Sequence, residues 1–304
     1  MNTAAKTLER AGFGTTPPEQ GQWMLLDNYS VIAVQGEDAG IFLQGQFSND
    51  IDALAPGRCQ LNAYCNPKGR VLALTRVLKR DAGFILLVPS DVAPNFIQRL
   101  RMFVMRAKVV FDMEDQPVAV GTWGPLTGLP DDAETFQCDQ EGFRKVCLVA
   151  RESLAKFDND CEAGSDLWKL LDISSGIPQV YSQTVEQFIP QNINLDLVDG
   201  VNFRKGCCPG QEIVARVKYR GRSKQRMIAG TVITDASVSP GEPVFVAGED
   251  NRKAGLIIDA VNLGEGTVCV SAVAPSPLET ELALMSGDGP RISIVALPYD
   301  VEQS

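Results

Sequence analysis

The last quarter of the chain constrains the fold most, because it contains six short apolar runs with no helical pattern between them. These runs cover residues 227–234, 243–247, 254–261, 267–274, 281–285 and 291–297. Turn-forming Gly, Pro, Asp and Ser residues separate the runs at nearly regular spacing, which is typical of antiparallel strands in a small barrel or sandwich. We therefore predict a separate β-domain over residues 223–304.

The preceding residues alternate between strand and helix patterns, which indicates the α+β class. Strands are predicted at 23–35, 59–64, 71–78, 84–88, 118–122 and 144–150, and helices at 37–47, 91–105 and 166–173. Asp91 is the predicted cap of the second helix. Two rounds of strands and helices suggest a core over residues 23–222, built of interleaved halves at about 23–110 and 111–222. We expect residues 1–22 to form a mobile N-terminal tail.

The chain contains no histidine among its 304 residues. This absence excludes Ser-His-Asp and Cys-His nucleophile systems and imidazole-ligated metal sites. It also removes the side chain that most often shuttles protons near neutral pH. Any acid–base step must therefore use carboxylates, lysine, tyrosine, cysteine or the ligand itself.

The eight cysteines are scattered along the chain and form no CxxC pair. Because the N-terminus lacks the apolar stretch of a secretion signal, we expect reduced thiols rather than a disulfide framework. The longest apolar runs are far shorter than the roughly 20 residues that a membrane-spanning helix needs. The sequence therefore predicts a cytoplasmic protein with no membrane association.

The formal net charge is −10, so the protein as a whole is not expected to attract nucleic acid. Residues 204–226 are the exception, because they contain eight basic residues and a single acidic residue, Glu212. This segment carries a local charge of +7 and leaves −17 for the rest of the chain. A basic island in an acidic protein favours a specific anionic partner.

Residues 204–210 combine two basic residues, two adjacent cysteines and two glycines. The glycines bracket the cysteines, which predicts a tight turn. Because Lys205 and its neighbour bring positive charge that favours a thiolate, Cys207 is the candidate reactive thiol. Adjacent residues point their side chains apart, so Cys207 and Cys208 are not expected to form a metal site. The alternative is that both thiols are small apolar filler on a buried turn.

Residues 212–220 alternate as a strand would. In an extended chain every second side chain lies on the same face. Six basic residues would then share one face, at 216, 218, 220, 222, 224 and 226. Gly221 interrupts that register, so two shorter patches are expected. The functional interpretation is a site for carboxylates or phosphates, whereas the alternative is a solubilising edge strand.

Two earlier segments are rich in polar side chains. Residues 46–50 end a predicted helix with amide and carboxylate groups that could hydrogen-bond a pterin-like heterocycle. The alternative is simple capping of the helix end and the turn after it. Residues 66–70 are interpreted first as a hairpin turn and second as an anion contact.

Residues 205–212, KGCCPGQE, resemble the KGCYxGQE motif of the YgfZ family. Flanking residues 188–191, 194–195, 214–216 and 219–221 also resemble that family, and the similarity runs from about residue 23 to the end. The resemblance implies a fold like the glycine-cleavage T-protein, with a C-terminal six-stranded antiparallel β-barrel. It also implies binding of tetrahydrofolate or a derivative, and a role in assembling or maintaining iron–sulfur proteins, including enzymes that thiolate tRNA.

The resemblance also implies site residues and partners. Cys207 and Lys205 are the candidate catalytic residues. Cofactor contacts are expected at Gln46, Asn49, Asp50, Arg70, Gln191, Gln211, Glu212, Arg216 and Lys218. The assignment of the last two residues to the glutamate tail of folate rests on their charge alone. Expected partners are folate and iron–sulfur client enzymes such as tRNA methylthiotransferases, and direct nucleic-acid binding is not expected.

This chain departs from the family and its relatives at two places. The aromatic residue after the motif cysteine is Cys208 here, which adds a second thiol. T-protein relatives use an aspartate on the hairpin turn to activate folate, but this turn contains Asn66, Pro67 and Lys68 and no acid. We therefore favour a folate-binding accessory protein. An aminomethyltransferase-like enzyme and a tRNA-binding module are the alternatives.

Overall fold

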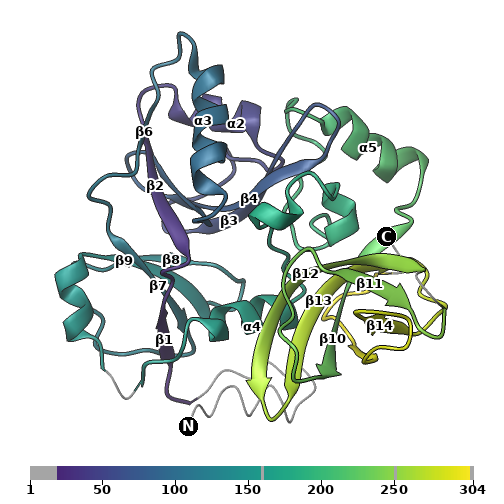
Figure 1. Ribbon diagram of the computed structural model, residues 1–304. Helices are drawn as coiled ribbons and strands as arrows, with labels where there is room; N and C mark the ends of the chain where they lie inside the picture. The colour runs from purple at the N-terminus through teal and green to yellow at the C-terminus, as the bar shows by residue number, and fades with distance from the viewer. Residues whose placement is uncertain (1–18, 159–160, 250–251, 302–304) are drawn as a thin grey trace.

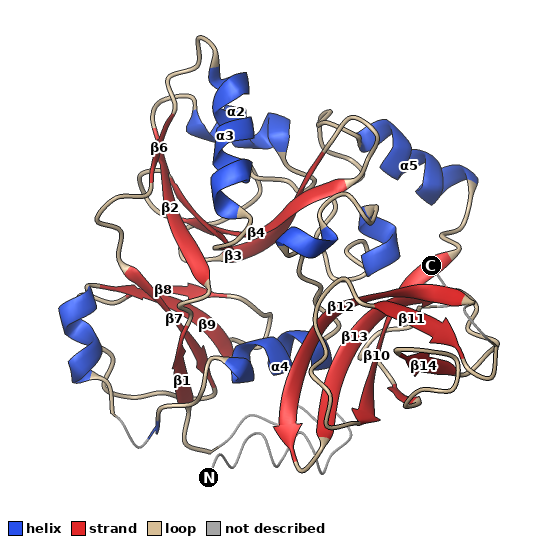
Figure 2. Cartoon of the chain, in the orientation of Figure 1, coloured by secondary structure: helices blue, strands red, loops and turns tan. Residues whose placement is uncertain are grey.

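Three antiparallel sheets form the framework of the computed structural model, which describes residues 19–158, 161–249 and 252–301 (Figure 1). The sheets have five, four and six strands. Helices are fewer than strands and lie beside the sheets (Figure 2). The predicted α+β class is confirmed. No helix of the described ranges is long and apolar enough to cross a membrane.

The five-stranded sheet is built from one continuous stretch of chain. Its strands are β2 (Tyr29–Gln35), β3 (Cys59–Cys65), β4 (Val71–Lys79), β5 (Phe84–Pro89) and β6 (Val110–Asp112), and its helices are α2 (Ala39–Gln46) and α3 (Ala93–Val104). The strand order is β3-β4-β5-β2-β6. Both helices pack their apolar residues into the same core cluster as the sheet. Helix α3 buries residues 93, 96, 97 and 100, the spacing of a single helical face.

The four-stranded sheet begins with the first strand of the described chain. Its members are β1 (Gln22–Leu25), β7 (Val118–Trp123), β8 (Glu134–Gln137) and β9 (Arg144–Val149), in the order β1-β7-β9-β8. The prediction of one strand over residues 23–35 is wrong. The turn-forming Asp27 and Asn28 break that segment, and the backbone N–H of Tyr29 closes the turn on the carbonyl of Leu26 at 3.1 Å. The two resulting strands belong to different sheets.

The six-stranded sheet contains one strand in each of the six predicted runs. These are β10 (Gln225–Ile233), β11 (Pro243–Val246), β12 (Lys253–Gly264), β13 (Thr267–Pro275), β14 (Leu282–Leu284) and β15 (Ile292–Val295), in the order β14-β11-β12-β13-β10-β15. Register shifts after Ile257 and after Asn262 bend β12. The edge strands approach each other at a bridge between Ala283 and Arg291, so the curled sheet closes part of the way into a barrel. The predicted C-terminal β-barrel is confirmed in this form.

Helix α4 (Asp166–Ser174) packs between the four-stranded and six-stranded sheets (Figure 1). It carries Asp172, whose carboxylate accepts ion-pair hydrogen bonds from Arg76 of β4 at 2.6 Å and from Arg144 of β9 at 2.7 Å. Both guanidinium groups also lie over the ring of Trp168, at 5.2 and 4.2 Å from its centroid. All four residues are buried. This group, the Asp172 cluster, joins the first sheet, the second sheet and α4.

Short 3₁₀ helices complete the connections. They are η1 (Arg151–Lys156), η3 (Ser182–Thr184) and η4 (Pro190–Ile193). Asp91 was predicted to cap α3, but the helix starts after Val92, and the Asp91 carboxylate accepts the backbone N–H of Ser182 at 2.7 Å. The aspartate therefore fastens the η3 segment to the start of α3 instead of capping the helix.

Residues 211–220 form a helix, α5 (Gln211–Arg220), where a strand was predicted. The alternating basic residues resembled a strand pattern, but Gln, Glu, Ala, Arg and Lys are all good helix formers. Only Val214 is buried among the ten residues of α5. The predicted single face of six basic residues is therefore wrong, because residues two apart on a helix point in different directions.

Two of the three predicted segment boundaries fall inside strands of the structure. Residues 1–18 of the expected tail lie outside the described residues, but its last residue, Gln22, is the first residue of β1 and pairs with Trp123. The expected division between the two halves, at residues 110 and 111, falls inside β6. The division before residue 223 stays a proposal, and β10 begins at Gln225.

Candidate functional site

The motif residues 205–212 form a loop that leads into α5 and lies against the turn between β3 and β4. Gly210 starts the helix with a left-handed φ of +76°. A Cβ atom at this position would lie 2.5 Å from the carbonyl oxygen of Asn66 and 2.6 Å from the Cα of Gly69. Glycine is therefore required both for the backbone conformation and for the close contact between the loop and the hairpin turn.

Lys205 fastens the other side of this loop to the end of α2. Its Nζ donates hydrogen bonds to the backbone carbonyls of Gln44 and Phe47, each at 2.5 Å, and of Asn49 at 3.1 Å. Burial lowers the pKa of Lys205, an effect that the nearby thiol of Cys208 opposes. These contacts make Lys205 a positioning residue for the loop, and its role in catalysis remains a prediction.

The two motif cysteines differ in exposure. The side chain of Cys207 is exposed, whereas Cys208 is partly buried. The backbone N–H of Cys208 donates to the side-chain oxygen of Gln211 at 3.1 Å, which closes the turn before α5. Burial raises the pKa of the Cys208 thiol, and the positive charge of Lys205 acts in the opposite direction. The expected lysine–thiol proximity is thus present at Cys208, while Cys207 is the thiol that is exposed to solvent.

Residues 46–50 lie beside the loop and are tied into the structure. Asn49 is buried, and its side-chain NH₂ donates to the backbone carbonyls of Leu61 and Asp199. Asp50 accepts the side-chain amide of Gln44 at 3.0 Å. Both polar groups therefore hold the end of α2 in place, which is the capping role that the sequence left open as an alternative.

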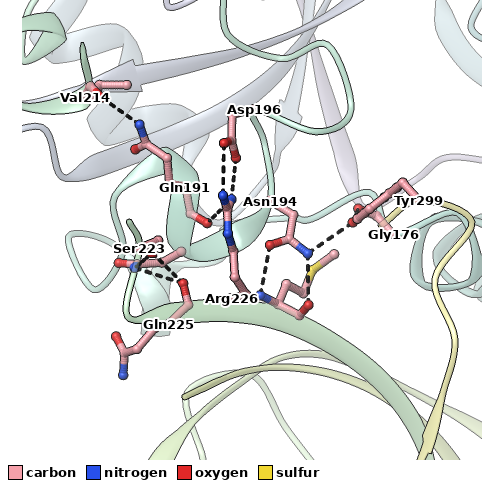
Figure 3. A network of polar contacts seen from close by, with 11 residues as sticks. Gly176, Gln191, Asn194, Asp196, Val214, Ser223, Gln225, Arg226 and Tyr299 are labelled. Atoms are coloured by element: carbon pink, nitrogen blue, oxygen red, sulfur yellow. Dashed lines mark hydrogen bonds and ion pairs between the residues drawn. The ribbon is translucent and has the colours of Figure 1, made fainter. Parts of the chain in front are cut away.

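Two of the predicted folate contacts have a side-chain oxygen that is buried and has no hydrogen-bond partner among the described residues. These are Oε1 of Gln46 and Oε1 of Gln191. The amide NH₂ of Gln191 donates to the carbonyl of Val214 in α5 at 2.6 Å (Figure 3). An unsatisfied buried acceptor is costly, and an N–H donor of a bound ligand would satisfy it. A pterin ring carries such donors, so these residues fit a folate.

Arg226 does not belong to the exposed basic island. It is buried and donates to the carboxylate of Asp196 at 2.7 Å and to the backbone carbonyl of Gln191 at 2.9 Å (Figure 3). The side chain of Asn194 donates to the backbone carbonyl of Met227 and accepts the backbone N–H of the same residue. These contacts fasten η4 to the start of β10, so Arg226 is used to join the motif region to the barrel.

The remaining basic residues of this region are exposed on α5 and on the segments at its two ends. These residues, called here the α5 cationic surface, are Arg204, Arg216, Lys218, Arg220, Arg222 and Lys224, and they do not share one face of the helix. None of the six forms an ion pair with any residue that the structure describes. Tyr219, 69% exposed, contacts Phe203 edge-on with the ring centroids 6.2 Å apart, and Lys218 Nζ lies 5.9 Å from the Phe203 centroid. The surface therefore combines free positive charge with an aromatic pair.

The other predicted contacts lie around the loop without converging on one point. Arg70 is exposed on the hairpin turn and donates to the backbone carbonyl of Gln187 at 2.7 Å. Gln211 caps the turn, and Glu212 is exposed on α5. The structure thus brings the loop, the end of α2 and the hairpin turn into contact, whereas Arg216 and Lys218 point to solvent.

Sequence reasoning missed two polar residues, one just before the motif loop and one in the barrel. Asn202 accepts the backbone N–H groups of Arg204 and Lys205 at 2.8 and 3.1 Å, and an asparagine just before a turn is the signal that would have identified it. Asp259 of β12 accepts the hydroxyl of Tyr181 at 2.7 Å. Burial raises the pKa of Asp259 to about 6. The sequence signal for Asp259 is a carboxylate within the apolar run of residues 254–261.

The chain has relatives among known proteins, although no family model matches it. An uncharacterized protein of Haemophilus influenzae is 34% identical over 287 residues, which cover 93% of this chain and 99% of the relative. The tRNA-modifying protein YgfZ of Klebsiella pneumoniae is 29% identical over 306 residues, covering 92% of this chain and 94% of the relative. The chain belongs to the YgfZ family.

A solved structure supports the fold of this YgfZ-family chain. The glycine cleavage system aminomethyltransferase T from Bartonella henselae superposes with a TM-score of 0.69, covering 96% of this chain and 89% of that one. The two sequences are only 16% identical, so the comparison concerns the fold alone. The predicted T-protein-like fold is confirmed.

Proposed function

We propose that this YgfZ-family chain is a folate-binding accessory protein that supports iron–sulfur enzymes, including those of tRNA modification, through the thiol of Cys207. The observation that carries the proposal is the exposed thiol on a loop fixed on two sides. Lys205 fastens one side to α2, and Gly210 allows the close contact with the hairpin turn. A thiol presented on a fixed loop is suited to contact a client protein or its cluster.

The proposed tRNA-modification role draws on the relative named a tRNA-modifying protein YgfZ. Client enzymes such as tRNA methylthiotransferases are the proposed partners, and the cytoplasm is the proposed compartment. Aminomethyl transfer is not part of the proposal, because Asn66, Pro67 and Lys68 supply no acid on the hairpin turn. The acidic group that activates folate in T-protein relatives is therefore missing from this position.

The thiol is tested in cells that lack the native gene and carry a variant copy. We expect Cys207→Ala to lower the level of methylthiolated tRNA at least 10-fold, while Cys208→Ala keeps most of it. The thermal midpoints of both purified variants should match the parent, because neither change removes a buried large side chain. Full tRNA modification with Cys207→Ala would reject the role of the thiol.

Folate binding is supported by the unpartnered oxygens of Gln46 and Gln191. These acceptors would hold the pterin, and Arg216 and Lys218 would receive the glutamate tail. Tetrahydrofolate, when bound, supplies a reduced pterin that carries one-carbon units. Calorimetric titration should give binding heat for the parent and weaker binding for Gln191→Leu and for the Arg216→Ala, Lys218→Ala double variant. An absence of binding heat in the parent would remove folate from the proposal.

A second candidate function is direct binding of tRNA by the α5 cationic surface. The specific observation is that its six cations are exposed and unpaired within the described chain, beside the rings of Phe203 and Tyr219. Cations bind phosphates, and exposed aromatic rings stack on unpaired bases. The exposed ring of Tyr219 was not predicted from the sequence, and it adds to the argument from charge.

Filter binding with purified tRNA at several salt concentrations tests this candidate. The Arg216→Glu, Arg220→Glu double variant should bind about 10-fold more weakly or worse, and its log–log salt slope should be smaller by about 2. Arg252→Glu is the matched control, because Arg252 already pairs with Glu249 at 2.9 Å, away from this surface. Equal tRNA binding by the double variant and the control would reject direct binding of tRNA by the α5 cationic surface.

A further inference from the structure

Two cysteines outside the motif lie side by side where the first and second sheets meet. Cys59 starts β3, and Cys138 directly follows β8. Residues Arg58 and Gln137 form a parallel bridge, and the backbone N–H of Gln137 donates to the carbonyl of Gly57 at 2.9 Å. Because this bridge sets a parallel register, Cys59 and Cys138 occupy the next pair of positions.

The register brings the two thiols within bonding reach. Neighbouring strands lie about 4.8 Å apart, and a disulfide spans Cα separations of about 4.4 to 6.8 Å. Both cysteine side chains pack against the same core cluster, which contains Trp168 and Leu78. They therefore project to the same side of the bridge.

Both thiols are half-buried rather than sealed. Cys138 lines a cavity of about 530 Å³ together with Trp123, Arg144 and Pro298. The cavity gives a small oxidant access to Cys138, and Cys59 beside it is partly exposed. Four other cysteines, Cys65, Cys147, Cys161 and Cys269, are buried, and the two motif cysteines are neighbours in sequence.

The surroundings activate one thiol of the pair. The adjacent Cys138 thiol lowers the pKa of Cys59, and the guanidinium groups of Arg76 and Arg144 lower it further against the effect of burial. The neighbouring Cys59 and burial both raise the pKa of Cys138. These opposite shifts favour Cys59 as the attacking sulfur, with Cys138 keeping its proton until the second step.

We propose that Cys59 and Cys138 are a modification site at which hydrogen peroxide forms a disulfide between the first and second sheets. The Cys59 thiolate attacks one peroxide oxygen, which breaks the O–O bond, forms a sulfenic acid and releases hydroxide. The hydroxide takes up the proton that Cys59 had lost. The Cys138 sulfur then attacks the Cys59 sulfur, and the sulfenic oxygen leaves as water with the Cys138 proton. Two thiols and one peroxide thus become one disulfide and two waters.

The cross-link would fix the relative position of the two sheets. The Asp172 cluster already joins them a short distance away through Arg76 and Arg144. A covalent bond would add a second attachment next to this one and would resist separation of the sheets. The proposal is independent of the function proposed for Cys207, because neither thiol of the pair belongs to the motif.

Peptide mapping of the full chain tests the proposal. The reduced protein is treated with equimolar hydrogen peroxide, alkylated, and digested with trypsin without reduction. We expect a cross-linked peptide that joins residues 59–68 to residues 109–144, which contain Cys59 and Cys138. Because residues 59–68 also contain Cys65, the link must persist in Cys65→Ser and disappear in Cys59→Ser and in Cys138→Ser. All four proteins carry Cys207→Ser and Cys208→Ser to prevent links through the motif.

Thermal unfolding gives a second measurement that does not depend on peptide recovery. The oxidised protein should unfold about 5 °C or more above the reduced protein, and dithiothreitol should reverse the shift. The shift should be absent in Cys138→Ser. Recovery of both peptides as separate alkylated species after peroxide treatment would overturn the proposal, as would a link that persists in Cys59→Ser.

Discussion

Lys205 is the residue on which the shape of the motif loop depends most directly. One ammonium group donates to three backbone carbonyls around the end of α2, and the chain segments that it joins lie more than 150 residues apart in sequence. Sequence reasoning identified this lysine as important but assigned it to the thiol of Cys207. The contacts favour positioning, because its three N–H donors are used by carbonyl oxygens.

Replacement of Lys205 by methionine keeps the length of the side chain and removes these hydrogen bonds. We expect a loss of about 2 kcal/mol in the free energy of unfolding, because partly buried carbonyls lose a charged donor. Urea unfolding measures the change. Lys218→Met is the matched control on the exposed side of α5 and should change the stability by less than about 0.5 kcal/mol. Equal effects of the two variants would contradict the positioning role.

Asp259 gives the protein a pH dependence of known sign. Its pKa rises from 3.8 to about 6 in the folded state, so the native carboxyl holds its proton to higher pH than the unfolded one. Its contribution to stability therefore falls as pH rises from about 4 to about 6, by about 3 kcal/mol in total. Asp259→Asn does not titrate, and the difference in unfolding free energy between parent and variant should fall accordingly between pH 4 and pH 7. A constant difference across urea titrations in this range would contradict the assignment.

Among the elements, the contact of α5 with the β3–β4 turn depends on Gly210. Gly210→Ala would place a Cβ atom 2.5 Å from a backbone oxygen at a left-handed φ, so the loop must move. We expect a loss of about 2 kcal/mol in stability and faster labelling of Cys208 by a thiol reagent. Gly206→Ala is the matched control, because a Cβ atom there meets no heavy atom within 4 Å. Unchanged Cys208 labelling in Gly210→Ala would contradict the close contact.

The elements also show what the sequence could predict. Hairpin turns and the spacing of apolar runs located all six strands of the barrel, because each strand is set by its own residues and the turns beside it. Helix α5 was predicted as a strand because its basic residues recur at every second position, which is the period of a β-strand. The loop of residues 205–210 was located by its glycines, whereas the carbonyls that Lys205 contacts belong to a distant segment and leave no local pattern.

At the scale of the molecule, the Asp172 cluster joins two sheets and α4. Arg76, Arg144 and Asp172 are far apart in sequence, so no spacing rule could have predicted that they meet. Asp172→Asn would leave two buried guanidinium groups without a counter-charge, and we expect a loss of about 3 to 5 kcal/mol in stability. Asp166→Asn, which removes an exposed partner 3.9 Å from Lys169, should cost less than about 1 kcal/mol. Similar thermal midpoints for the two variants would contradict the structural role of the cluster.

Strand β1 lies at the edge of its sheet, where it pairs with β7 along its whole length, with Gln22 opposite Trp123. During synthesis on the ribosome, the first strand must therefore wait until about 100 further residues have emerged before its partner exists. The five-stranded sheet of residues 29–112 can assemble in the meantime, since all of its strands lie in that interval. Nascent chains halted before residue 118 should expose β1 to proteases, and chains long enough for residues 118–123 to leave the ribosome should protect it.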